Sequence, residues 1–187
     1  MSALNRRVTG AVLGSLLALG GTAVGPAAAA GEPRAAACGP VDESHIQARW
    51  TALGGQNSAL GCPVGDLYDV YVGGVKRGER QYFQYGSMTH SPAQGPDMVV
   101  SAWERRGYAY FNWGTTSPYH YDVFLYRWTS PADAQGEQRQ TSGGTSGQVR
   151  VVRETTGAYK FKVEGCDDGT FGLTCRQGWT LTAPSHG

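Results

Sequence analysis

The sequence of 187 residues lacks the features by which several large classes of protein are identified. Neither sign of charge dominates, because 16 Lys+Arg stand against 15 Asp+Glu, and no cluster of basic residues is present to neutralise nucleic-acid phosphates. The apolar run from Ala11 to Val24 is about 14 residues long, whereas a helix that crosses a membrane needs roughly 20. We therefore expect neither a nucleic-acid partner nor stable insertion into a membrane.

The signatures of catalysis and of metal binding are also missing. Gln148 stands where the G-x-S-x-G nucleophile motif over 144–148 requires glycine, and the acidic residues show no spacing that marks a pair of glycosidase carboxylates. The four cysteines lack the C-x2-4-C spacing of zinc sites, and the four histidines are scattered. We expect a non-enzymatic protein without catalytic residues, metal or cofactor, and keep a small hydrolase of envelope polymers as the third hypothesis.

The first thirty residues have the pattern of a secretory signal peptide. Arg6 and Arg7 precede the apolar run, and 28–30 are three alanines suited to cleavage. Removal of residues 1–30 would take two basic and no acidic residues, which leaves 14 Lys+Arg against 15 Asp+Glu and a net charge of −1. We predict an exported protein, with residues 31–37 as a linker, and leave open whether export uses the general secretory or the twin-arginine route.

Cysteine usage agrees with export, because four cysteines in a secreted chain most simply form two disulfides. Of the three possible pairings, proximity in sequence favours Cys38 with Cys62 and Cys166 with Cys175. In the loop-entropy model, closures of these lengths stabilise a fold by about 3 kcal/mol each.

One short helix is expected near the start of the exported chain. Ile46, Trp50 and Leu53 recur at i, i+4 and i+7 and share a helical face. Ser44 is placed to cap the helix, and Gly54 can end it in a left-handed conformation. The residues that follow, 67–92, are aromatic and β-branched between glycines, and the Gly73-Gly74 pair predicts a β-hairpin.

These motifs resemble the LGFP repeat of exported actinobacterial proteins. The resemblance covers about residues 44–97 and rests on the motifs I-x3-W-x2-L-G-G at 46–55, L-G-C-P at 60–63, F-x2-G at 83–86 and S-P-x2-G at 91–95. It implies a small α+β module over 38–97 that associates with the cell wall or its polysaccharides. The chain departs from the family in having a single copy and in placing Cys62 where the repeat has another side chain.

From residue 98 onward the pattern is that of an all-β domain. Alternating apolar residues occur over 108–113, 148–152 and 159–164, while 121–128 is apolar on both faces, as in a central strand covered on both sides. The order of Trp113, the 121–125 strand and Tyr159 resembles a fibronectin type III-like domain over 98–187. The predicted fold class is therefore mainly β: a small α+β module with one helix, followed by an antiparallel β-sandwich.

All twenty Phe, Trp and Tyr residues lie beyond residue 49 and supply the candidates for ligand binding. Aromatic rings beside hydrogen-bonding groups suit sugar binding, and alternation assigns Trp50, Phe83, Trp113, Phe161 and Trp179 to cores. The surface candidates for a cell-wall polysaccharide or another envelope component are Tyr82, Tyr85, Tyr108, Tyr110, Tyr119 and Tyr121.

The second hypothesis is a secreted inhibitor or protein-interaction factor. A disulfide between Cys166 and Cys175 would constrain the 167–174 loop, with Phe171 and Leu173 as apolar anchors for a secreted protein partner. The same two side chains can alternatively tuck into the end of the sandwich, in which case they would not be available to a partner.

Overall fold

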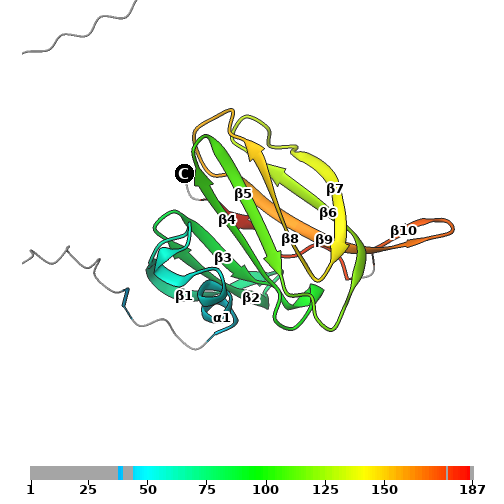
Figure 1. Ribbon diagram of the computed structural model, residues 1–187, viewed down its shortest axis with the longest axis horizontal. Coiled ribbons are helices and arrows are strands. Elements are labelled where there is room, and N and C mark those ends of the chain that lie inside the picture. Colours follow the sequence, from blue (N-terminus) through cyan, green and yellow to red (C-terminus); the bar gives the residue numbers. More distant parts are fainter. Residues whose placement is uncertain (1–37, 40–43, 176, 186–187) are drawn as a thin grey trace, which may run out of the picture. The chain divides into compact units, whose positions relative to one another are not determined.

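Two antiparallel sheets and one short α-helix make up the computed structural model (Figure 1), which describes residues 38–39, 44–175 and 177–185. The fold class is therefore mainly β, as the alternating patterns predict. The expected signal peptide, residues 1–30, and the expected linker, residues 31–37, lie outside the described residues. Within the described ranges, no helix has both the length and the apolar character that crossing a membrane requires.

The first sheet has six strands in the spatial order β1-β2-β3-β4-β5-β8. Their bounds are β1 Pro63–Val72, β2 Val75–Phe83, β3 Gly86–His90, β4 Val99–Arg105, β5 Tyr108–Gly114 and β8 Ser146–Val152. The hairpin predicted at Gly73-Gly74 joins β1 to β2, and both glycines have the positive φ, 59° and 79°, that such a two-residue turn requires.

The second sheet has the order β10-β9-β6-β7, with β11 paired to β9. Its strands are β6 Tyr121–Thr129, β7 Glu137–Gly144, β9 Lys160–Gly169, β10 Gly172–Thr174 and β11 Ala183–Pro184. Two 3-10 turns, η1 Gly55–Asn57 and η2 Pro92–Gln94, complete the elements. Figure 1 shows the β9–β10 hairpin extending beyond the rest of the second sheet.

The predicted helix is α1 (His45–Ala52), which lies on the outer face of the six-stranded sheet. The Ser44 side chain accepts a hydrogen bond from the Gln47 N–H at 3.1 Å, and Gly54 adopts the left-handed conformation with φ 108°. Eight residues form too short a helix to persist alone in water. Burial of Ile46 and Trp50 against the sheet therefore holds it in place.

Each face of the six-stranded sheet has its own core. Between the two sheets, the alternation in β5 buries Ala109, Phe111 and Trp113 against Phe124 and Phe161 of the second sheet. Beneath α1, a smaller core contains Ile46, Trp50, Leu60, Phe83, Met88, Val99 and Trp103. Because both faces are covered in part, the sheet can present functional side chains only where α1 leaves its outer face open.

Residues 44–97 and the residues that follow them share the first sheet. Strand β3 pairs with β4 across the boundary expected at 97/98, from Gly86↔Trp103 to His90↔Val99. The buried Gln94 side chain accepts a hydrogen bond from the N–H of Gly165 at 3.0 Å and donates to the carbonyl oxygen of Gly178. The described residues form one compact unit, and the expected boundary lies inside its larger sheet.

The structure corrects two expectations about apolar segments. Strand β6 is central, between β7 and β9, but its Val123 and Leu125 are only half-buried, because no helix or strand among the described residues covers the outer face of the second sheet there. Trp179 was expected in a core, yet it lies outside any strand and is half-buried, with the ammonium of Lys162 4.8 Å from its ring centre. Trp179 is not part of a regular strand, so the alternation of the sequence around it does not predict its burial.

Candidate functional site

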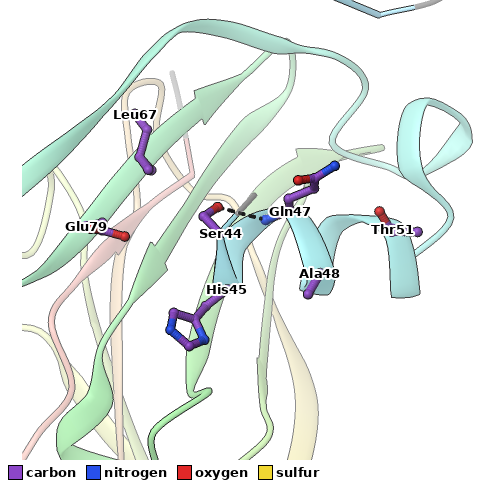
Figure 2. Close-up of a pocket in the computed structure, with 7 residues that line it drawn as sticks. All are labelled: Ser44, His45, Gln47, Ala48, Thr51, Leu67 and Glu79. Carbon is purple, nitrogen blue, oxygen red and sulfur yellow. Dashed lines mark hydrogen bonds between the residues drawn. The ribbon is translucent and has the colours of Figure 1, made fainter. Parts of the chain in front are cut away.

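A hollow on the outer face lies between α1 and the β1–β2 hairpin (Figure 2). This groove has a volume of about 790 Å³ and is lined by Ser44, His45, Gln47, Ala48, Thr51, Leu67 and Glu79. In Figure 2 the helix contributes the polar wall, while Leu67 and Glu79 come from the two strands. The groove is wide and open. It could therefore hold a ligand only through polar side chains that are not already paired within the protein.

The charged groups of this groove are already paired within the protein. His45 Nδ1 lies 2.8 Å from Asp97 Oδ1, and the His45 ring stacks on His90 with centroids 4.1 Å apart. Burial lowers the pKa of His90, whose Nε2 is 2.7 Å from the carbonyl oxygen of Pro96. Glu79 pairs with Lys76 at 2.9 Å. These interactions hold α1 and the hairpin, and leave the groove without a charge directed at a ligand.

A second surface lies on the same side of the sheet, over β4, β5 and β8. Side chains alternate along a strand, so the residues between the buried Ala109, Phe111 and Val151 point outwards. We call this surface the aromatic–arginine face, and it consists of Arg49 from α1 together with Trp103, Arg105, Tyr108, Tyr110, Asn112, Gln148 and Arg150.

Aromatic rings and a guanidinium group form one side of the aromatic–arginine face. The register aligns Trp103, Tyr110 and Arg150 across three neighbouring strands. The rings of Trp103 and Tyr110 are parallel within 2°, with centroids 5.5 Å apart. The Tyr108 ring lies 6.2 Å from that of Tyr110, and the guanidinium carbon of Arg150 is 4.6 Å from the centre of the Tyr108 ring. This packing limits the movement of all four side chains.

Hydrogen-bonding groups form the other side. Arg49 Nη2 donates to Asn112 Oδ1 at 2.6 Å and to the carbonyl oxygen of Trp113 at 3.2 Å. Asn112 Nδ2 donates in turn to Gln148 Oε1 at 3.5 Å. Burial lowers the pKa of the Arg49 guanidinium. The face thus places an ordered cation and the exposed Gln148 amide, both held by the buried Asn112, next to the aromatic rings.

The outward positions of the aromatic–arginine face carry charge of one sign, while Asp133, Glu137 and Glu154 line a hollow at its edge together with Tyr108 and Arg150. The three arginines of the face come from α1, β4 and β8, and no outward position of β4, β5 or β8 carries Asp or Glu. Among the residues that the structure describes, none of these three arginines forms an ion pair with a carboxylate. The surface is therefore suited to a ligand with apolar patches, hydroxyl groups and negative charge.

The tyrosines selected from the sequence lie in separate parts of the fold. Tyr108 and Tyr110 are on the aromatic–arginine face, and Tyr85, 59% exposed in the β2–β3 turn, borders a hollow together with Arg105. Tyr82 lies on the opposite sheet face and stacks on Tyr68, with centroids 6.1 Å apart. The six residues therefore do not form one row.

The remaining two tyrosines lie at the start of β6. Tyr119 is 44% exposed in the preceding loop. Tyr121 is 5% exposed and belongs to the core between the sheets, which corrects its selection as a surface candidate. Its ring packs against Phe124 and over Gly165, where a side chain would collide with it, and burial raises the pKa of its hydroxyl to about 12.

Sequence reasoning missed six residues of the aromatic–arginine face: Arg49, Trp103, Arg105, Asn112, Gln148 and Arg150. Asn112 could have been found from the sequence, because the alternation of β5 places Asn112 on the same face as Tyr108 and Tyr110. The others belong to separate elements: the pairing of β5 with β4 and β8 brings the strand residues to it, and the docking of α1 brings Arg49.

The β9–β10 hairpin forms a third, separate surface (Figure 1). The predicted disulfide Cys166–Cys175 is confirmed, as is Cys38–Cys62. Phe171 is fully exposed in the turn and Leu173 is 39% exposed, so neither side chain tucks into the end of the sandwich. The hairpin therefore presents an apolar tip on a covalently closed base.

Comparisons of this chain with protein-family models, with curated proteins and with solved structures found no match. The described residues contain no group of three or more His, Cys, Asp or Glu side chains arranged to hold a metal ion.

Proposed function

We propose that this is an exported, non-enzymatic binding protein that associates with a polysaccharide of the cell envelope through the aromatic–arginine face. The observation that carries the proposal is the surface formed by Tyr108, Tyr110 and Arg150, in which the buried Trp103 supports the Tyr110 ring and the exposed Gln148 amide lies alongside. Sugar rings offer apolar C–H faces and many hydroxyl groups, and aromatic side chains flanked by amides and guanidinium groups complement both.

The proposed ligand contacts are not the residues that define the LGFP-like motifs. Several motif residues have structural roles: Trp50 Nε1 donates to the carbonyl oxygen of Gly61 at 2.9 Å, and Phe83 and Leu60 are buried beneath α1. A side chain at Gly86 would collide with the backbone of Ala102. The motifs build the module that supports α1 and Arg49, so they contribute to the binding surface indirectly.

Pelleting with purified cell-wall sacculi tests the proposal. We expect the exported protein, residues 31–187, to sediment with the sacculi. Tyr108→Ala removes a ring from the aromatic–arginine face and should weaken binding roughly tenfold, equivalent to about 1.4 kcal/mol. Tyr119→Ala removes a more exposed ring from another surface and should have no effect. Wild-type protein that stays in the supernatant, or an equal loss in both variants, would contradict the proposal.

The exposed Phe171 favours a second candidate function, recognition of a secreted protein by the β9–β10 hairpin. The disulfide lowers the entropy lost when the hairpin becomes ordered on a partner, and an aromatic side chain that is fully exposed in the free protein can fill an apolar pocket of that partner.

Phe171→Ala should abolish capture of a secreted partner from culture filtrate while leaving the melting temperature unchanged. Tyr119→Ala should retain capture of the same protein, because it removes an aromatic ring elsewhere. A protein captured equally by both variants would show that the hairpin tip is not the contact.

A further inference from the structure

Two described arginines are balanced by a carboxylate, whereas the three arginines of the aromatic–arginine face are not; Arg77 and Arg106 also form no ion pair with a described residue, but they do not share a surface with aromatic rings and amides in this way. Arg139 pairs with Glu137 and Arg153 pairs with Glu104, each at 2.8 Å. Arg49, Arg105 and Arg150 pair with no described carboxylate, although the exported chain as a whole would be close to neutral. The positive charge of this face is thus a local property of three aligned elements.

Arg49 shows most clearly that the charge is unbalanced. Its guanidinium is half-buried and is held by neutral acceptors alone, Asn112 Oδ1 and the carbonyl oxygen of Trp113. Its Nε is buried without a hydrogen-bond partner. Withdrawing a cation from water without an anion costs free energy, which a bound negative group would recover.

We propose, building on the function proposed above, that the polysaccharide is acidic: a polymer of pyranose sugars bearing carboxylates, with its negative groups bound by Arg49, Arg105 and Arg150. Guanidinium groups bind the planar carboxylate with two parallel hydrogen bonds. The rings of Tyr108 and Tyr110 require a ligand with sugar rings between its charges, which a polyol phosphate chain lacks. The tyrosine rings and the arginine charges of this face together favour a polymer of pyranose rings that carry carboxylates.

A matched pair of polymers separates charge from sugar contact. Polygalacturonate and its fully methyl-esterified form have the same backbone and differ only in the carboxylate charge. By isothermal titration at low salt, we expect the acid to bind at least tenfold more tightly than the ester. The difference should shrink as salt rises towards 0.5 M, because mobile ions screen exposed charges.

Substitutions test whether the preference for the acidic polymer depends on the aromatic–arginine face. Arg150→Gln and Arg105→Gln change exposed side chains and should each weaken binding of polygalacturonate about fivefold to tenfold, with little effect on the ester. Arg150→Lys should restore part of the loss, since it keeps the charge without the planar fork. The control Arg77→Gln removes the same charge from an exposed position of β2 and should bind as wild type.

The outcomes distinguish this inference from the proposed function. Equal binding of acid and ester, together with binding to sacculi, would overturn the acidic specificity and leave the polysaccharide function standing. Binding to ribitol-phosphate polymer or to single-stranded DNA in preference to polygalacturonate would also overturn it, since phosphate would then be the group recognised. Failure to bind either polymer and failure to bind sacculi would overturn both.

Discussion

Replacing Phe161 with alanine is expected to lower the free energy of unfolding by about 3–5 kcal/mol, the usual cost of removing a buried phenylalanine. Phe161 has no exposed surface and stacks on Phe111 with ring centroids 4.4 Å apart, and its centroid lies 5.9 Å from that of the Trp113 ring. Its ring joins β9 of one sheet to β5 of the other. The cavity would therefore lie at the centre of the core, where neither sheet can collapse without breaking its own pairing.

The chain contains a matched control in Phe171. The same substitution removes the same atoms, but Phe171 is fully exposed in the β9–β10 turn, so Phe171→Ala should change the free energy of unfolding by less than about 0.5 kcal/mol. Urea unfolding followed by tryptophan fluorescence gives both values. A loss of several kcal/mol for Phe171→Ala would mean that the hairpin tip packs against the protein, and would remove the basis for its role in recognition.

Local patterns predicted most of the individual elements. The helical spacing of Ile46 and Trp50 with the cap at Ser44, the Gly73-Gly74 turn and the alternation of β5 each depend on residues a few positions apart. Such information is contained within a short window of sequence. For the same reason, the two disulfides were identified from nearest neighbours along the chain.

The arrangement of these elements was not predictable in the same way. Strand β5 pairs with β4, its neighbour in sequence, and with β8, more than thirty positions away, and no local motif encodes the second partner. Tyr121 alternates like an exposed residue, but Gly165 on β9 leaves space for its ring. The aromatic–arginine face depends on this long-range register, so the sequence indicated two of its tyrosines and not its arginines.

Arg49 links the candidate site to the stability of α1. The helix has eight residues, and its position depends on the small core beneath it and on the Cys38–Cys62 disulfide, which encloses it. A change that releases α1 should therefore act on stability and on ligand binding together, whereas a change in the β9–β10 hairpin should leave the aromatic–arginine face intact.

Replacing Cys38 and Cys62 together with serine is accordingly expected to lower the free energy of unfolding by about 3 kcal/mol. The bridge spans 24 positions of sequence, and closing a loop of that length restricts the unfolded chain by about this amount. The Cys166–Cys175 bridge spans 9 positions, so its removal should cost about 1 kcal/mol less. Chemical denaturation of the two double variants measures the difference.

Removal of the two disulfides should differ more in its effect on ligand binding than in its effect on stability. Without Cys38–Cys62, α1 should open locally, which hydrogen exchange of its backbone amides would detect, and Arg49 would lose its fixed position beside Asn112. Affinity for polygalacturonate should then fall in proportion to the population of the open form, under conditions where the sheets remain folded. The Cys166 and Cys175 double variant should keep both the protection of α1 and the affinity. Equal loss of affinity in the two variants would show that ligand binding does not depend on the helix.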